Sequence, residues 1–313
     1  MHDDMPTVSV IMNCLNCSRY LREAIDSVYA QTYTDWEIIF WDDASTDNSA
    51  EIAKSYDERL KYFKCDKTVA LYAARNLALK EAKGKYIAFL DCDDIWLPQK
   101  LEEQIPLFEK DPKVGIVFSD SILFNEKGNK KLFFNIVKPE KGYVFSKLLI
   151  CDFVHMPTVV VRKEAFDTLT YWFDSRFNMS GDHEAWIRIS SKWKLDYVNK
   201  PLALYRVHSS NMTNTQGRKF LSHEIGLMIE NLKKVVDNAE EKYSKEIKFL
   251  ERRKDTHLSL LDWETGENKR ARKRVCPHIR SSTTHMILYL LMYFPYRYVF
   301  KLSYRLYNRN LTA

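Results

Sequence analysis

Three carboxylates follow a short apolar run in the first third of the chain. Residues 86–90 (YIAFL) are apolar, and Asp91, Asp93 and Asp94 come directly after them. Such a run after a Gly-Lys turn predicts a buried central strand. Asp91 and Asp93 are alternate residues, so their side chains can point the same way. Two such oxygen ligands suit Mg²⁺ or Mn²⁺, although a solvated turn after a strand would also explain the pattern.

The neighbouring sequence predicts strands and helices in alternation. Residues 7–13 (TVSVIMN) and 36–41 (WEIIFW) are further apolar runs, and the second ends in Asp42 and Asp43. A helical pattern follows each run, and another precedes the Asp91 strand, which predicts βαβ units and a parallel sheet. Ligands bind beyond the carboxyl ends of parallel strands, so these acidic residues are expected at a binding edge.

A second acidic group lies much later in the chain. Residues 179–189 (MSGDHEAWIRI) begin a predicted helix, with Asp182 and Glu184 in its first turn after Gly181. Acidic residues at this end gain from the helix dipole, and the residues alone favour this capping role. A carboxylate that removes a proton from a substrate hydroxyl is the alternative.

Five segments in order resemble glycosyltransferase family 2, and the similarity covers residues 7 to 208, roughly two thirds of the chain. The resemblance implies the GT-A fold, an α/β domain with a Rossmann-like, mostly parallel central sheet flanked by helices. We expect this domain over residues 1–215, with a donor half to about 115 and an acceptor half after it, and a helical extension over 216–313. The five segments are 8–13 (VSVIMN), 27–33 (SVYAQTY), 41–47 (WDDASTD), 74–76 (ARN) and 89–96 (FLDCDDIW).

The resemblance implies roles for the donor-side residues. The segment around Asn13 should line the nucleoside pocket. Asp42 matches the acidic residue that contacts the base or the ribose, and Asp43 lies beside it. Arg75 matches a basic residue near the donor nucleotide, which we expect to be UDP or dTDP.

A divalent metal, Mn²⁺ or Mg²⁺, is also implied. Asp91 and Asp93 match the family's DxD pair, and Asp93 is expected to be the direct metal ligand. A metal that bridges the pyrophosphate neutralises the charge that develops on this leaving group. His208 is a further candidate for the metal or diphosphate, and Arg206 for the phosphate charge.

For the acceptor half, the resemblance changes the interpretation of the second acidic group. Asp182 matches the carboxylate that deprotonates the acceptor hydroxyl, and Glu184 is a reserve candidate or an orienting partner. The implied activity is metal-dependent, inverting transfer of a sugar from a nucleotide-diphospho-sugar to a glycan or lipid-linked oligosaccharide. Biosynthesis of surface polysaccharide or O-antigen is the expected setting.

Two other functions remain open at this stage. A phosphohydrolase of the haloacid dehalogenase type also places Asp-x-Asp after a strand, but Ile95 and Trp96 stand near the position where that class has Gly-Thr. A non-catalytic sugar-nucleotide-binding subunit would explain the donor motifs alone. Because all the expected carboxylates are present, we favour the enzyme over both.

The composition agrees with an enzyme in a reducing compartment. The chain has 313 residues with 48 basic and 42 acidic side chains, a net charge of +6 that does not by itself indicate nucleic-acid binding. Of the six cysteines, Cys14 and Cys17 form a single C-x-x-C, which does not predict a zinc site. No apolar segment stands at the start of the sequence, so we expect a cytoplasmic catalytic domain.

The last part of the chain has the character of a membrane-surface segment. Residues 269–274 (KRARKR) are basic, and the uncharged run 281–296 is shorter than the roughly 20 residues that a spanning helix needs. Basic residues then recur every four positions among aromatic ones, which is typical of a helix at an anionic membrane interface. Packing of this helix on its own domain is the alternative. The recurring residues are Arg297, Lys301, Arg305 and Arg309.

Overall fold

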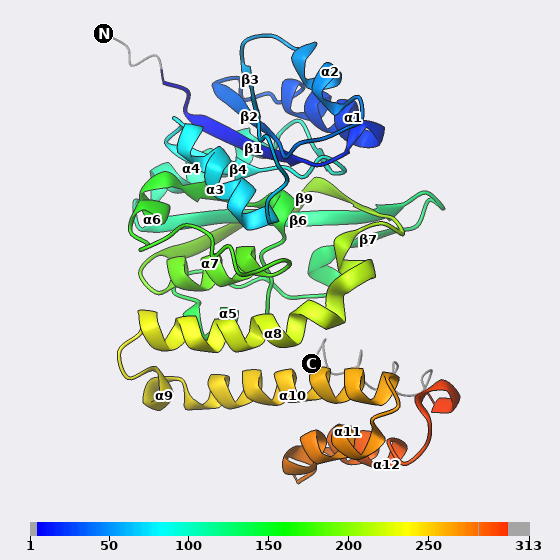
Figure 1. The fold of residues 1–313 in the computed structure, drawn as a ribbon. Coiled ribbons are helices and arrows are strands. Elements are labelled where there is room, and N and C mark those ends of the chain that lie inside the picture. Colours follow the sequence, from blue (N-terminus) through cyan, green and yellow to red (C-terminus); the bar gives the residue numbers. More distant parts are fainter. Residues whose placement is uncertain (1–4, 281, 300–313) are drawn as a thin grey trace. The chain divides into compact units, whose positions relative to one another are not determined.

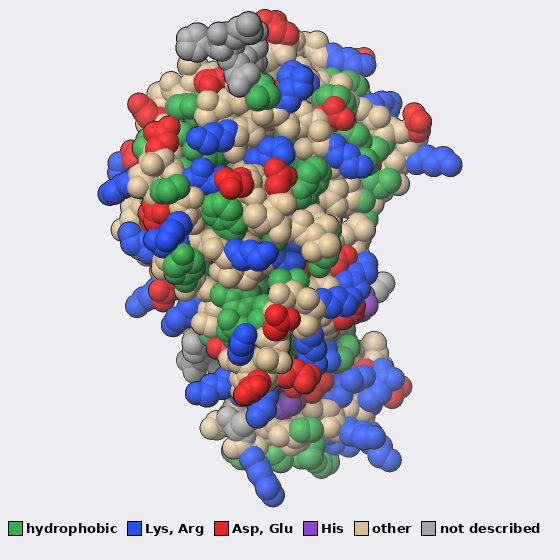
Figure 2. Space-filling view, turned by 90° about the vertical axis from the view of Figure 1, so that its left-hand side faces the viewer, with side chains coloured by type: hydrophobic (Ala, Val, Ile, Leu, Met, Phe, Trp, Pro, Cys, Tyr) green, Lys and Arg blue, Asp and Glu red, His purple; other side chains and the backbone are tan. Residues whose placement is uncertain are grey.

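The computed structural model describes residues 5–280 and 282–299, and the side chains of all of these except 212–219. The chain divides into two compact units, Met1–Asn211 and Met212–Ala313. Basic and acidic side chains are interspersed on the face of the molecule shown in Figure 2, so the net positive charge does not gather there into one patch.

The first unit is built on a nine-stranded sheet in the order β3-β2-β1-β4-β8-β6-β9-β5, with β7 paired to β6 (Figure 1). The pairs β1–β2, β2–β3, β1–β4 and β6–β9 are parallel, whereas β8 runs antiparallel to both β4 and β6. The strands are β1 (Val8–Cys14), β2 (Trp36–Asp42), β3 (Leu60–Lys64), β4 (Tyr86–Phe89), β5 (Ile95–Trp96), β6 (Val114–Asn125), β7 (Lys130–Leu132), β8 (Val160–Arg162) and β9 (Lys194–Val207).

Helices flank this sheet and bury apolar faces against it. In the first helix, Leu21, Ala24, Ile25 and Val28 are buried at the i, i+3, i+4, i+7 spacing of one helix face. The fold class expected from the sequence is confirmed: a mostly parallel sheet flanked by helices, with further helices after it. The helices of this unit are α1 (Ser18–Tyr29), α2 (Ser49–Lys54), α3 (Leu71–Glu81), α4 (Lys100–Lys110), α5 (Phe145–Ile150), α6 (Lys163–Asp167) and α7 (Gly181–Ser190).

The register of the parallel strands brings their carboxyl ends to one edge of the sheet. Ile11 of β1 lies opposite Phe89 of β4, and Cys14 lies opposite Asp42 of β2. The backbone N–H of Asp43 also donates to the Cys14 carbonyl at 2.8 Å. The residues that follow β1, β2 and β4 therefore emerge side by side.

The second unit is helical. Its two long helices, α8 and α10, pack together, and a small core forms among α10, α11 and α12. No helix in the described part of the chain is long and apolar enough to cross a bilayer. The helices are α8 (Met212–Val235), α9 (Ala239–Lys242), α10 (Ser244–Glu264), α11 (Asn268–Val275) and α12 (Thr283–Leu291), and the buried core residues are Leu260, Trp263, Ala271, Val275, Leu288 and Met292.

Candidate active site

The acidic loop after β4 is a tight turn in which the three aspartates differ in environment. The Asp94 N–H donates to the Asp91 carbonyl at 3.1 Å and closes the turn. Asp94 is 1% exposed, and its Oδ1 accepts the backbone N–H of Arg206 in β9 at 2.9 Å. Burial raises the pKa of Asp94 well above its usual range, and the neighbouring Asp93 and Asp91 add to this. Asp94 therefore joins the acidic loop to β9, and the other two aspartates remain accessible.

Asp93 meets the loop that follows β9. Its Oδ2 lies 3.0 Å from His208 Nε2 and 3.4 Å from Asn211 Nδ2. His208 Nδ1 in turn lies 2.8 Å from the Ser210 hydroxyl, which orients the ring. Burial, followed by the charge of Asp91, raises the pKa of Asp93. The structure thus brings together two predicted residues that are 115 positions apart in the chain.

Asp91 pairs with α3. Its Oδ1 accepts a hydrogen bond of 2.8 Å from the Arg75 guanidinium, whose side chain is only 4% exposed. The Asp91 side chain is 38% exposed and stays open to a ligand. Nearby negative groups, Asp91 first among them, raise the pKa of Arg75 despite its burial. Arg75 is thus a buried, permanently charged cation behind the acidic loop.

Asp182 lies at the start of α7 and also contacts α3. The Tyr72 hydroxyl donates to Asp182 Oδ1 at 3.1 Å and lies 2.8 Å from the Met179 carbonyl. Burial and, after it, the charge of Asp152 raise the pKa of Asp182 against the opposing charge of Arg75, and the resulting pKa is about 6. Tyr72 and Arg75 are one helical turn apart, so a single turn of α3 contacts both Asp182 and Asp91.

Gly181 allows α7 to approach Tyr72 closely. A Cβ at position 181 would lie 2.8 Å from carbons of the Tyr72 ring, so a larger residue does not fit without displacement. This explains physically why glycine precedes Asp182, a feature that the sequence showed without its reason.

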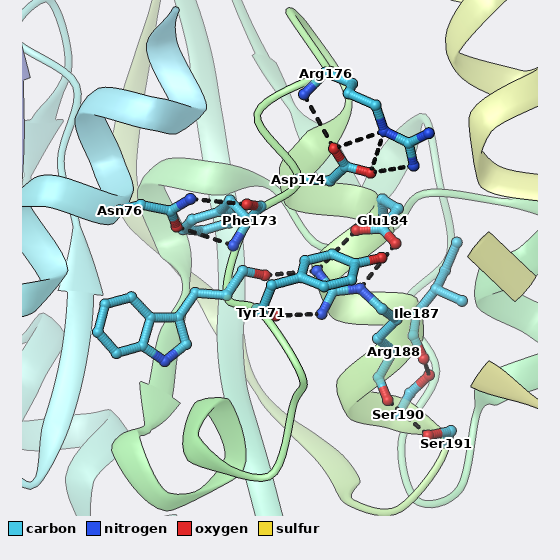
Figure 3. Close-up of polar contacts among 11 residues, drawn as sticks. Asn76, Tyr171, Phe173, Asp174, Arg176, Glu184, Ile187, Arg188, Ser190 and Ser191 are labelled. Atoms are coloured by element: carbon cyan, nitrogen blue, oxygen red, sulfur yellow. Dashed lines mark hydrogen bonds and ion pairs between the residues drawn. The ribbon is translucent and has the colours of Figure 1, made fainter. Parts of the chain in front are cut away.

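The loop before α7 is fixed by side chains from α3 and α7 (Figure 3). The Asn76 side chain makes two hydrogen bonds to the Phe173 backbone, at 2.8 and 3.0 Å. The Arg188 guanidinium donates to the carbonyls of Tyr171 and Trp172 and to both oxygens of Glu184. Because Glu184 is 2% exposed and paired with Arg188, its carboxylate is committed to holding this loop rather than available to a substrate.

The residues that the sequence predicts to contact the nucleoside lie at the ends of β1 and β2. Asp42 is fully buried, and its two oxygens accept hydrogen bonds from Ser45 N–H at 2.7 Å and the Tyr62 hydroxyl at 2.6 Å. Asp43 accepts the N–H of Val69, and burial raises its pKa. The Asn13 Nδ2 atom is buried and has no hydrogen-bond partner among the described residues. An unsatisfied donor of this kind is costly unless a ligand or water completes it.

Arg206 is largely occupied by contacts within the protein. Its guanidinium donates to the Asp93 carbonyl at 2.9 Å and pairs with Glu23 at 2.5 Å. It also stacks on the rings of Tyr20 and Phe124, at 4.2 and 4.7 Å from their centroids. These contacts, with an exposure of 9%, indicate that Arg206 braces the acidic loop.

The donor atoms around Asp93 fit a divalent metal shared with a substrate. Asp93 and His208 supply a carboxylate oxygen and an imidazole nitrogen, with side chains 31% and 14% exposed. Mn²⁺ accepts such ligands, and hard divalent ions are commonly held by one or two side chains plus substrate phosphates. Within the described residues, the acidic loop and His208 do not form a three-ligand cluster. The cluster found there is instead Cys14, Cys17 and Cys92.

Several residues of the site carried no signal in the sequence. Tyr72 and Asn211 reach the acidic residues from α3 and from the end of the first unit. His155 is stacked on Phe133 at 4.5 Å, and its Nδ1 lies 2.7 Å from the Ser121 hydroxyl. Burial lowers the pKa of His155 to about 4 against the opposing charge of Asp91, which connects it to the acidic loop, so its ring is neutral at pH 7.

Comparisons with known proteins agree with this arrangement. The profile of Glycosyl transferase family 2 matches residues 9–170. An uncharacterized glycosyltransferase of Methanocaldococcus jannaschii is 36% identical over 215 residues, which cover 65% of this chain and 72% of the relative. The UDP-Glc:alpha-D-GlcNAc-diphosphoundecaprenol beta-1,3-glucosyltransferase WfgD of Escherichia coli is 31% identical over 212 residues, 67% of this chain and 80% of the relative.

A solved structure gives the same fold. A mannosyltransferase of Pyrobaculum calidifontis, in complex with GDP-Man and Mn²⁺, superimposes with a TM-score of 0.63 at 17% identity. The match covers 97% of this chain and 86% of that one. The fold is therefore the GT-A type. With the profile match and these relatives, the chain belongs to glycosyl transferase family 2 and is a glycosyltransferase.

Proposed function

We propose that the protein catalyses metal-dependent, inverting transfer of a sugar from a nucleotide-diphospho-sugar to a hydroxyl group of a glycan or lipid-linked acceptor. The observation that carries the proposal is the pair of contacts made by one turn of α3, Arg75 to Asp91 and Tyr72 to Asp182. They bring the acidic loop and a separate carboxylate to neighbouring positions on one face of α3. An inverting transfer needs a carboxylate besides those of the donor site, because the base acts opposite the leaving group.

Asp182 is the proposed base. With a pKa of about 6 it is ionised at pH 7 and still basic enough to take a proton from the acceptor hydroxyl. The acceptor oxygen forms its bond to the anomeric carbon while the bond from that carbon to the diphosphate breaks, and the proton passes to Asp182. Glu184, the reserve candidate, is better assigned to positioning, since Arg188 engages both its oxygens.

Asp93 and His208 are the proposed metal ligands, and Asp91 lies beside them. Mn²⁺ or Mg²⁺ bound there supplies positive charge to the departing diphosphate. Arg75 adds a fixed positive charge behind the acidic loop and keeps Asp91 oriented. We assign Arg206 to bracing this loop in place of the phosphate contact suggested by the sequence.

For the nucleoside, we assign Asn13 and Asp43. The buried, unsatisfied amide of Asn13 supports a contact with an acceptor atom of the ligand. Asp42 matches the family's acidic residue by position, but Ser45 and Tyr62 already engage its two oxygens. We therefore propose that Asp42 stabilises the turn after β2 and that Asp43 makes the direct contact with the nucleoside.

UDP or dTDP is the proposed nucleotide, and the UDP-glucose donor named for the Escherichia coli relative supports this. GDP is included among the nucleotides to be tested because the Pyrobaculum structure contains GDP-Man. Membership of family 2 leaves no basis for the phosphohydrolase alternative. A non-catalytic binding subunit would bind donor and show no turnover.

Calorimetry tests the donor site. UDP, dTDP, GDP and CMP are titrated into the full chain with and without Mn²⁺, and into Asp93→Ala under the same conditions. We expect one nucleoside diphosphate to bind in a metal-dependent manner, with binding lost in the variant. Asp255→Ala, a change in α10, is the matched control and should bind as the wild type does. Equal binding by Asp93→Ala would disprove the proposed metal site.

We further propose that the acceptor is lipid-linked and that the second unit contacts an anionic membrane surface. Met286, Leu290, Tyr293 and Phe294 are exposed on and after α12. Exposed Lys269 and Lys273 lie on the neighbouring α11. Basic and apolar groups together suit an interfacial segment. Lys301, Arg305 and Arg309 of the predicted cationic stripe lie outside the described residues.

Vesicle flotation tests this surface. The full chain should float with vesicles that contain anionic lipid, and Leu290→Ser with Phe294→Ser should reduce the floating fraction several-fold. Val235→Ser, an exposed apolar residue at the end of α8, is the control. Unchanged flotation of the double variant would contradict the proposed surface.

A further inference from the structure

Three cysteines from separate segments converge beside the acidic loop. Cys14 ends β1, Cys17 directly precedes α1, and Cys92 stands between Asp91 and Asp93. Their sulfur atoms all lie within 4.8 Å of one another, and all three are free thiols. The sequence showed only the Cys14-x-x-Cys17 pair, because the third ligand comes from a strand end 75 residues later.

The spacing suits a soft metal ion. A Zn–S bond of about 2.3 Å places the sulfurs of a tetrahedral site about 3.8 Å apart. The thiols therefore need to close by about 1 Å or less, a movement that short loops can make. Thiolates select zinc-like ions over Mn²⁺ and Mg²⁺, which prefer oxygen. The site is thus chemically distinct from Asp93 and His208.

The surroundings also favour binding. The Ser45 hydroxyl lies 3.7 Å from Cys14 Sγ and is an oxygen candidate for the fourth position. Cys14 and Cys92 are 1% and 3% exposed, whereas Cys17 is partly exposed and provides a route for the ion.

We propose that Cys14, Cys17 and Cys92 form a thiolate site for a soft divalent cation of the zinc class. As each sulfur–metal bond forms, the thiol releases its proton to solvent, so no oxidant or reductant is required. The bound ion joins the end of β1 to the acidic loop.

Cadmium titration of the reduced, full-length protein tests the proposal. Cd²⁺ bound to thiolates gives an ultraviolet charge-transfer band, and we expect it to saturate at one ion per chain and to persist in excess Mn²⁺. Cys17→Ser and Cys92→Ser should each weaken Cd²⁺ binding at least about tenfold, the range of losses seen when a metal site loses supporting groups. Cys276→Ser, at an exposed cysteine of the second unit, should bind Cd²⁺ as the wild type does.

The Cd²⁺ charge-transfer band reports on the three thiols and is independent of the donor site. Circular dichroism establishes that each variant is folded. Because Cys17 is partly exposed, its substitution should disturb the core least. A band that survives in folded Cys17→Ser and Cys92→Ser would overturn the proposal, as would the absence of a saturable band. A Cys14–Cys17 disulfide found by peptide mapping, with no Cd²⁺ band after reduction, would instead identify a redox pair. Donor binding does not enter the Cd²⁺ measurement, so failure of the proposed function leaves it interpretable.

Discussion

The hydroxyl of Tyr72 lies 3.1 Å from Asp182 Oδ1, and the side chain one turn further along α3, Arg75, lies 2.8 Å from Asp91 Oδ1. Two carboxylates that are far apart in the chain are therefore oriented by the same helix turn. A rigid helix that holds both groups fixes the distance between the proposed base and the proposed donor site. Such pre-organisation is what a transfer between two bound substrates requires.

Asp182→Asn tests the base. The amide keeps the shape of the side chain but cannot accept the proton, so kcat should fall about 10²–10⁴-fold while nucleotide binding is retained. In the wild type, kcat/KM should fall below pH 6, because protonation of the carboxylate, whose pKa is about 6, removes the base. Glu164→Gln, which changes an exposed acid in the first turn of α6, is the control. A loss of kcat smaller than about tenfold would exclude Asp182 as the base.

Tyr72→Phe should change the pH profile more than the maximal rate. The Tyr72 hydroxyl stabilises the ionised form of Asp182, so its removal raises the pKa of that carboxyl. One hydrogen bond contributes about 1 kcal/mol, which moves the acidic limb of kcat/KM to higher pH by up to about one unit. A purely structural role would lower activity equally at every pH. Tyr56→Phe, which removes a hydroxyl bonded to Asp26, should leave the profile unchanged.

Gly181→Ala should disturb the packing of Tyr72 against α7 from the α7 side. The new Cβ would lie 2.8 Å from carbons of the Tyr72 ring, whose hydroxyl is shared between the Met179 carbonyl and Asp182. Overpacking of this kind costs about 1–3 kcal/mol of unfolding free energy, measurable by urea denaturation. Gly226→Ala in α8 has its nearest side-chain atom at 3.9 Å and should instead stabilise the protein by up to about 1 kcal/mol. Equal stabilities for the two variants would show that the ring yields freely.

The edge of the sheet was predictable because it depends on local patterns. Apolar runs that end in Asp42 and Asp91 indicate buried strands, and parallel strands bring these ends together. The alternation of strand and helix patterns also predicted a mostly parallel sheet, and this prediction is confirmed. Nothing in the sequence indicated that β8 lies between β4 and β6 in the antiparallel direction, because a three-residue strand has too few positions to show a pattern.

The contacts of the site could not be predicted, because they join residues distant in the chain. Tyr72 and Asp182 are 110 positions apart, and nothing in a helical pattern distinguishes a tyrosine that meets a carboxylate from one in a core. Arg206 was a plausible phosphate ligand by charge alone, and only the fold reveals that it pairs with Glu23. Cys92 likewise stands alone in the sequence and joins Cys14 and Cys17 through the adjacency of β1 and β4.

His208→Gln tests the proposed nitrogen ligand. Glutamine can still hydrogen-bond Asp93 but is a poorer ligand than imidazole, so the Mn²⁺ concentration for half-maximal UDP binding should rise about ten- to a hundredfold. Calorimetric titration of Mn²⁺ at fixed UDP measures this. His223→Gln, at an exposed histidine of α8, is the matched control. An unchanged Mn²⁺ requirement would assign His208 to hydrogen bonding with Asp93 alone.

Glu184→Gln separates stability from catalysis in the first turn of α7. The variant leaves the buried Arg188 without its carboxylate, and breaking a buried ion pair from one side costs about 3–5 kcal/mol of unfolding free energy. The exposed pair Lys163–Asp167 has the same i,i+4 spacing, and Asp167→Asn there should cost less than about 1 kcal/mol. Activity per folded Glu184→Gln molecule should stay close to wild type, because Asp182 remains. If the folded variant instead lost activity to the extent of Asp182→Asn, Glu184 would be the base and its pairing with Arg188 would have to open during the reaction.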